Sequence, residues 1–213
     1  MWVAVIMVAS VATWAFDWTG SKSEPKLRFV PVGQPVGGPS STAPAIDPAT
    51  LEAELVAPPE GFEPLETSDG GVYDIERLAA LQSEENRAPF RAALLVLGFR
   101  GGFLRMTSAP DQALVLEQFV FAIDLPGAAA PEAAEGFARG VVSGSPGESF
   151  AVPEIPSAAG LTMVQSHDGQ DVHIRLISFL AAARIHLVIG FDAGGPVEPG
   201  VVLDVAVRQF QHG

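Results

Sequence analysis

The pair Asp168-Gly169 lies between two apolar runs and constrains the fold more than any other feature of the chain. Asp-Gly is favoured in two-residue β-turns, because both positions need a positive φ that these residues tolerate. We therefore predict that residues 161–167 and 170–180 form a hairpin. Residues 184–191 show the same alternation and predict a third antiparallel strand, reached through residues 181–183.

Three other segments have the apolar spacing of helices. Residues 75–81, 89–97 and 131–142 repeat apolar positions every three or four residues. Pro89 suits a first helical turn, and Gly98 suits the left-handed residue that follows a helix end. We expect these helices to cover the sheet.

The remaining regular segments complete the predicted fold. Residues 103–107 and 113–123 predict two strands, and the second is apolar on both faces, as expected of a central strand covered on both sides. Residues 201–210 fit a strand by their β-branching or a helix by the preceding Pro199, and we favour the helix. The fold class is α+β, an antiparallel sheet with helices packed on it.

Residues 2–16 form an uncharged, mostly apolar run. Its helical length of about 22 Å is below the hydrocarbon thickness of ~30 Å, but Trp14 and Trp18 extend it toward the membrane interface. We predict a transmembrane anchor or uncleaved signal over residues 1–20. The alternatives are a buried globular segment and a cleaved signal, although no basic residue precedes the run and no clear cleavage site follows it.

The charges beside this run conflict with the topology that we expect. Lys22, Lys26 and Arg28 follow the run, and the positive-inside rule would keep that side in the cytoplasm. We nevertheless expect a single-pass membrane protein with most of the chain extracytoplasmic. A basic leader upstream of Met1 would reconcile the two.

Residues 21–50 are rich in Pro, Gly and Ser and predict a semi-rigid linker. The alternative is an extended arm that wraps a partner subunit. Residues 51–213 then form the globular α+β domain. The predicted order is anchor, spacer and domain.

Composition excludes several function classes. The 213 residues include 25 acidic and 12 basic side chains, and the net charge of −13 argues against nucleic-acid binding. The chain has no cysteine, which excludes disulfides, thiolate metal sites and a thiol nucleophile. No cofactor is expected.

No motif of catalysis or metal binding emerges from the spacing. The glycines at 98–102 follow a helix and precede a strand, which is the reverse of a phosphate-binding loop. His167 and His173 point to opposite faces of the predicted hairpin, so one metal ion could not readily bind both. We predict no catalytic residue, no metal site and no enzyme activity.

One face of the hairpin offers a candidate ligand site. Strand alternation places Ile174, Leu176 and Leu180 on the core face and a mixed polar and aromatic set on the other. An arginine fork binds carboxylate or phosphate, and phenylalanine adds stacking area. The alternative is a partly solvated face or one covered by a helix. The candidate ligand-binding residues are His173, Arg175, Phe179 and His186.

The segment Gly98-Phe99-Arg100-Gly101-Gly102-Phe103, together with the anchor, spacer and terminal helix, resembles actinobacterial membrane-anchored or lipoprotein-like envelope domains. Some of these have a PsbP-like α/β sandwich fold. The resemblance implies a sensing, binding or accessory role and supplies no catalytic residues. This chain departs from the lipoprotein members because it has no cysteine to lipidate.

These observations predict a membrane-tethered, extracytoplasmic, non-catalytic binding or sensor module of the cell envelope. Its expected partners are the membrane, through the N-terminal helix, and an envelope protein. The main alternative is an accessory subunit of a membrane complex, since small residues such as Ala4 and Ala9 suit helix packing. A hydrolase is a distant third.

Overall fold

The computed structural model describes residues 46–65, 69–81, 84–111, 113–124, 130–143, 147–167 and 170–213. The expected anchor, most of the expected linker and the turn pair Asp168-Gly169 lie outside these residues. Within the ranges described, every helix is too short or too polar to cross a membrane.

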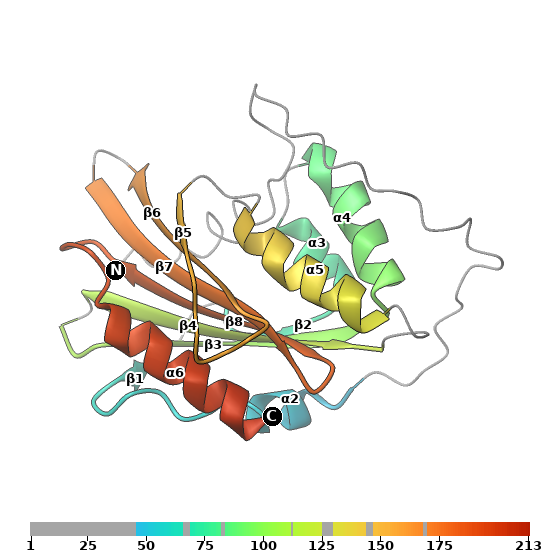
Figure 1. The fold of residues 1–213 in the computed structure, drawn as a ribbon, viewed down its shortest axis with the longest axis horizontal. Coiled ribbons are helices and arrows are strands. Elements are labelled where there is room, and N and C mark those ends of the chain that lie inside the picture. The colour runs from blue at the N-terminus through green and yellow to red at the C-terminus, as the bar shows by residue number, and fades with distance from the viewer. Residues whose placement is uncertain are drawn as a thin grey trace.

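An antiparallel sheet of eight strands organises the described part of the chain (Figure 1). The order across the sheet is β1-β3-β4-β8-β7-β6-β5, and β2 pairs with β3 beside β1. The strands are β1 (Glu63–Pro64), β2 (Gly71–Tyr73), β3 (Phe99–Ser108), β4 (Leu114–Ile123), β5 (Glu148–Phe150), β6 (Ala159–His167), β7 (Gln170–Ala181) and β8 (Arg184–Asp192).

Helices cover both faces of this sheet (Figure 1). One face packs against α3, α4 and α5, and the other against α6 and α2. The helices are α2 (Pro48–Ala53), α3 (Ile75–Ala80), α4 (Glu84–Val96), α5 (Ala130–Ser143) and α6 (Pro199–His212). The α+β prediction is confirmed, and so is the central position of β4.

Three apolar clusters fill the two interfaces. The largest joins β4 side chains such as Phe119 and Phe121 to the helices α3, α4 and α5. On the opposite face, Ile177 and Val188 pack under α6, while Val120 packs under α2. The sheet therefore has an apolar core on each side.

The structure corrects several boundaries. The helix expected to begin at Pro89 begins at Glu84, so Pro89 is its sixth residue and does not lie in the first turn. β3 begins at Phe99 and not at residue 103, and β5 forms in a segment for which no strand was predicted. The terminal segment is a helix, as favoured.

Gly98 makes the sharp turn from α4 into β3. Its φ is +66°, and a Cβ there would lie 2.0 Å from the carbonyl oxygen of Asp124. A side chain is excluded by both the conformation and the space. The predicted left-handed residue after this helix is therefore confirmed.

Candidate functional site

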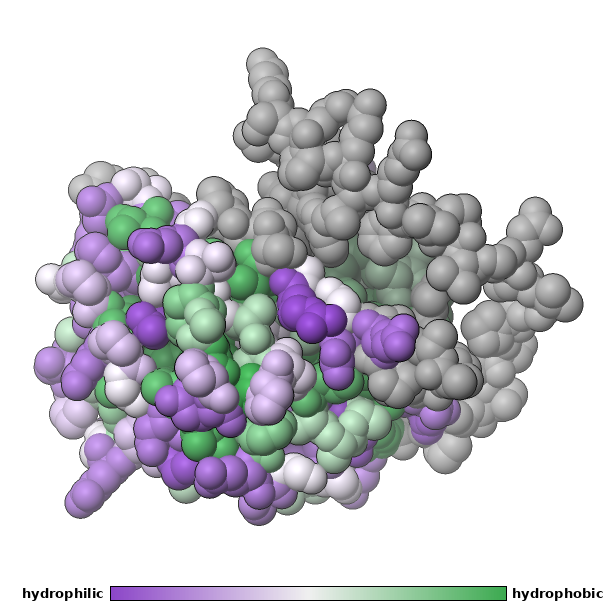
Figure 2. All heavy atoms as spheres, viewed as in Figure 1, coloured by the Kyte–Doolittle hydropathy of each residue, from purple (hydrophilic) through white to green (hydrophobic). Residues whose placement is uncertain are grey.

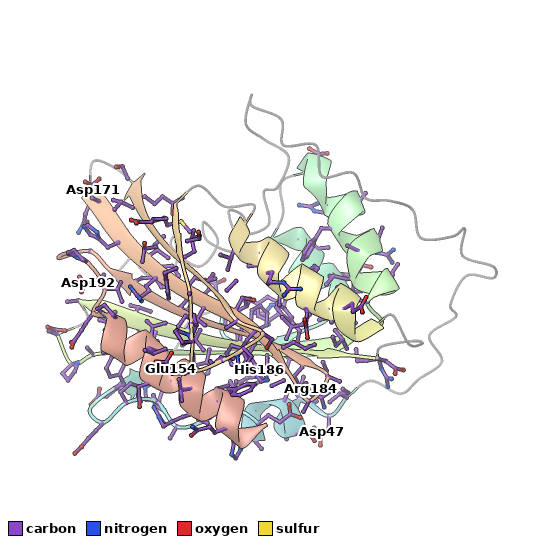
Figure 3. All side chains as sticks on the ribbon, in the orientation of Figure 1. Asp47, Glu154, Asp171, Arg184, His186 and Asp192 are labelled. Carbon is purple, nitrogen blue, oxygen red and sulfur yellow. The ribbon has the colours of Figure 1, made fainter. Side chains whose placement is uncertain are left out.

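The hairpin brings the four candidate ligand residues onto one face, in the predicted register. Phe179 pairs with His186 across β7 and β8, and Arg175 pairs with Gly190. His173 pairs with Asp192 at the far end of the same two strands. Figure 3 shows Asp192 at the left end of the sheet and His186 well away from it. The four residues share a face without forming one site.

The two ends of this face differ in exposure. Phe179 and His186 are buried, and their rings stack with centroids 5.1 Å apart. His173 and Arg175 are partly exposed. The Arg175 guanidinium lies 4.0 Å from the centre of the Phe150 ring. The helix-covered alternative thus describes one end, and the partly solvated alternative describes the other. Hydrophobic and hydrophilic side chains are interspersed over the side that carries α6 and β5 (Figure 2).

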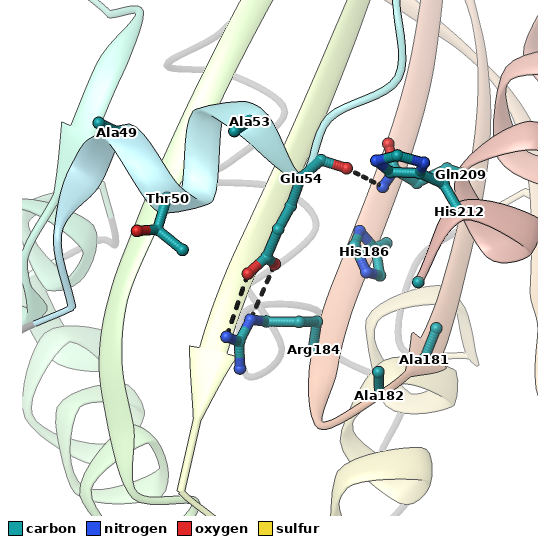
Figure 4. Close-up of a pocket in the computed structure, with 11 residues that line it drawn as sticks. Ala49, Thr50, Ala53, Glu54, Ala181, Ala182, Arg184, His186, Gln209 and His212 are labelled. Carbon is teal, nitrogen blue, oxygen red and sulfur yellow. Dashed lines mark hydrogen bonds and ion pairs between the residues drawn. The ribbon is translucent and has the colours of Figure 1, made fainter.

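A pocket of about 650 Å³ lies between α2, the β7–β8 turn and the last turn of α6 (Figure 4). One candidate residue, His186, lines it. The sequence analysis missed its other polar residues, which come from segments far apart in the chain. The lining residues are Ala49, Thr50, Ala53, Glu54, Ala181, Ala182, Arg184, His186, Gln209, His212 and Gly213.

A two-pronged ion pair forms one wall of the pocket. Arg184 Nε donates to Glu54 Oε2 at 2.9 Å, and Arg184 Nη2 donates to Glu54 Oε1 at 3.1 Å. Each side chain is mostly buried. The pair joins α2 to the start of β8, across 130 residues of sequence.

His186 is the buried titratable side chain of the pocket. Only 2% of the residue is exposed, and its Nδ1 atom has no hydrogen-bond partner among the described residues. Burial, with a smaller contribution from the Arg184 charge, lowers the pKa of His186 to about 3. The imidazole is therefore neutral at physiological pH and offers one donor and one acceptor.

The C-terminal end of α2 is held by side chains from three other elements. Arg105 on β3 donates to the carbonyl oxygens of Glu52, Leu55 and Val56 at 3.1–3.3 Å. Gln118 on β4 also donates to the Val56 carbonyl, at 3.0 Å. The Glu52 carbonyl belongs to the last turn of α2, and the Leu55 and Val56 carbonyls follow the helix, so these bonds hold both the helix end and the segment after it.

Gln209 on α6 completes this arrangement. Its Nε2 donates to the Glu54 carbonyl at 2.7 Å, and its Oε1 accepts from the Val56 amide at 3.0 Å. We call Arg105, Gln118 and Gln209 the α2 clamp. It fixes α2 beside the pocket and links it to α6.

The turn beside the pocket adopts an unfavourable conformation. Ala182 and Ala183 have φ values of 45° and 60°, as a two-residue hairpin turn requires. Asn and Gly are the usual residues there, because a Cβ in this region costs roughly 1–2 kcal/mol per residue. The sequence retains small apolar side chains at this rim.

A second buried titratable side chain, an acid, lies on the other face of the sheet. Glu117 is 4% exposed, and its Oε1 atom has no hydrogen-bond partner in the described part of the chain. Burial, with a smaller contribution from the charge of Asp69, raises the pKa of Glu117 to about 8. Within the described ranges, no three His, Cys, Asp or Glu side chains are grouped to hold a metal ion.

Comparisons with known proteins add little to this geometry. No protein-family model and no curated protein matches the chain. It is similar to a solved structure, the extracellular domain of PknH from Mycobacterium tuberculosis, at 12% identity and a TM-score of 0.41, covering 79% of this chain and 98% of that one. A similarity this low transfers neither a location nor a function to the chain. The PsbP-like architecture is not confirmed.

Proposed function

We propose that this chain is a non-catalytic binding or sensor module of the cell envelope, tethered by residues 1–20, and that the α2–α6 pocket binds its ligand. The pocket carries the proposal, because it is a concave site with a small number of convergent polar groups. The buried nitrogen of His186 supports it further, since an unpartnered polar atom in a folded protein marks a place where a ligand can supply the partner.

Ligand-observed NMR tests the pocket. We would screen the full chain, in mild detergent, against a library of small neutral, anionic and cationic compounds. Ala53 is exposed on α2 and lines the pocket, so Ala53→Phe fills the space without disturbing the core. Hits that bind the wild type and are lost in this variant support the proposal.

The control for this screen is Ala92→Phe, the same change at an exposed position of α4 on the opposite face. It should leave binding unchanged. Hits that survive in Ala53→Phe would place the ligand elsewhere. A library without hits at millimolar concentration would overturn the proposed pocket.

Protease treatment of intact cells tests the tethered envelope location. We expect external protease to degrade residues 51–213 and to leave a small membrane-bound stub. Complete protection in intact cells that is lost when the membrane is permeabilised without dissociating membrane complexes would overturn the extracytoplasmic location.

An accessory subunit of a membrane complex is the second candidate. One observation favours it: Val164, 56% exposed, lies on the part of β6 beyond its pairing with β5. Strand edges of this kind can pair with a strand from another protein. A stoichiometric complex that persists through purification in mild detergent would support the subunit, and a lone monomer would support the module.

A further inference from the structure

Glu54 and Arg184, which line the pocket, already bind each other. Both carboxylate oxygens of Glu54 accept hydrogen bonds from Arg184. The third guanidinium nitrogen, Nη1, donates to the Ala183 carbonyl at 3.4 Å. A charged ligand would have to compete with this pair for either partner. The wall formed by Glu54 and Arg184 is therefore close to electrically neutral.

Outside this ion pair and the clamp residue Gln209, the buried polar side chain of the lining is the neutral imidazole of His186. Thr50 on α2 and His212 at the end of α6 add exposed polar groups. His186 lies on β8 between the apolar cluster under α6 and the cluster under α2. Its stacking on Phe179 fixes the ring plane. A hydroxyl or amide group can donate to Nδ1 in one imidazole tautomer or accept from it in the other, without introducing a charge into a buried site.

A ligand in this pocket would touch α2 and α6 at once. Ala49 and Ala53 contribute from α2, and Gln209 and His212 contribute from α6. The α2 clamp ties the same two helices together through Gln209. Figure 4 shows the clamp bond from Gln209 to Glu54 beside His186. A bound ligand therefore adds contacts between α2 and α6, the two helices that the clamp already connects.

We infer that the pocket takes an uncharged ligand with hydroxyl or amide groups, and that its occupancy is coupled to the docking of α2. The inference rests on the proposed function, because it assigns a ligand class and a consequence to the same pocket. The coupling is reciprocal: a ligand that prefers docked α2 stabilises the docked state, and undocking of α2 weakens ligand binding. Because α2 begins within the last residues of the predicted linker, a change in its docking would alter the segment that leads to the membrane tether.

Three sugars of one ring type separate the ligand classes: N-acetylglucosamine is neutral, glucosamine is a cation and glucuronate is an anion. We would measure their binding to the full chain by NMR and follow α2 by hydrogen exchange and mass spectrometry. At ten times its Kd, the neutral sugar should slow exchange of residues 48–56 about tenfold, if α2 opens only in the unliganded state. Binding of a charged sugar that equals or exceeds the neutral one would overturn the ligand class.

Two variants probe the mechanism. His186→Phe keeps the aromatic stack but removes both nitrogens, and it should weaken N-acetylglucosamine binding at least tenfold. His186→Asn retains a donor and an acceptor and should keep part of the affinity. Circular dichroism would confirm that both variants are folded. Equal affinities in the wild type and both folded variants would overturn the role of His186.

Arg105→Met tests the coupling. It removes three bonds to the end of α2, outside the pocket lining, and should speed exchange at residues 48–56 and weaken sugar binding together. Arg91→Met is the matched control, since Arg91 pairs with Glu76 on the opposite face of the sheet. It should change neither readout.

Different results would overturn the coupling and the proposed pocket. Binding that is lost in Ala53→Phe but leaves α2 exchange unchanged would overturn the coupling and leave the proposed pocket intact. If the wider library yields no ligand that depends on Ala53, the proposed pocket itself fails.

Discussion

Glu117 and His186 are buried titratable side chains whose pKa values lie far from their ordinary values, at about 8 and about 3. They lie on opposite faces of the sheet, and burial favours the neutral form of each. The pKa of the acid rises and the pKa of the base falls. The ordinary pKa values of the two groups are 4.5 and 6.5. Between these pH values, a rise in pH lowers the contribution of Glu117 to stability and raises that of His186.

Glu117→Gln should remove a loss of stability at neutral and alkaline pH. The folded wild type keeps a proton on Glu117 up to about pH 8, whereas the unfolded chain releases it near pH 4.5. The contribution of Glu117 to the free energy of unfolding of the wild type therefore falls by up to ~1.4 kcal/mol per pH unit across this interval. The advantage of the variant should grow from pH 4.5 to 8 and stay constant above it.

Urea denaturation at several pH values measures this advantage. Glu148→Gln, at an exposed position, is the control and should follow the wild type at every pH. A constant difference between Glu117→Gln and the wild type from pH 4.5 to 8 would show that Glu117 ionises normally.

Strand alternation predicted which of these side chains share a face, because side-chain direction is a local property of a strand. It placed His186 with Phe179, as the structure confirms. The same alternation puts Glu117 on the face of β4 that carries Phe119. It could not predict which helix covers each face. That depends on tertiary packing, so the burial of His186 under α6 and α2 was not evident from the sequence.

At the scale of single elements, a substitution in the β7–β8 turn should stabilise the protein. Ala183→Gly places glycine at a φ of 60°, where it has no steric penalty. We expect the free energy of unfolding to rise by about 1 kcal/mol, because the strain of the alanine exceeds the greater chain entropy of glycine. Ala183 does not line the pocket, so ligand binding should be unchanged. Thermal denaturation of the two proteins decides; a lower melting temperature would mean that the turn is not strained.

Gly190 keeps α6 close to the sheet. A Cβ there would lie 2.7 Å from Val202 Cγ2 and 2.8 Å from Val197 Cγ1. Gly190→Ala should therefore displace α6 and destabilise the protein by about 1–3 kcal/mol. Gly136→Ala is the contrasting control: it lies in α5 with open space around it and should stabilise by about 0.5–1 kcal/mol. Equal effects of the two changes in urea denaturation would contradict this packing.

The predicted elements follow from local signals. The hairpin, the helix that ends at Gly98 and the terminal helix all carried a period or a capping residue. β5 carried neither, since three residues are too few to show alternation. It forms because its backbone pairs with β6. The start of α2 at Pro48 likewise falls within the expected linker, where the density of proline hid the helix.

At the scale of the whole molecule, one sheet serves two cores. Leu176 and Ile177 are adjacent in sequence, but Leu176 faces α5 and Ile177 faces α6. Each alanine variant should lower the free energy of unfolding by about 2–5 kcal/mol. We expect a single unfolding transition in both, because neither core persists without the shared sheet. Far-UV circular dichroism during urea denaturation measures this, with Val164→Ala, at an exposed position, as the control.

A second transition in one variant would show that the two layers unfold separately.

The pocket is also a property of the whole molecule. Glu54 and Arg184 form an ion pair although 130 residues separate them in sequence. No local sequence pattern around either residue indicates its partner. The sequence therefore supported a prediction of the sheet and of one lining residue, but the pocket arises only from the complete fold.

The short length of β5 has a further consequence. It pairs with residues 160–162 of β6 and leaves residues 163–167 without a neighbouring strand on that side, within the described residues. An open edge of this kind is a template for strands from other molecules. Self-association at high protein concentration would accordingly begin at this corner of the sheet. A lysine in place of Val164, which projects into solvent there, would discourage such growth and keep concentrated samples dispersed.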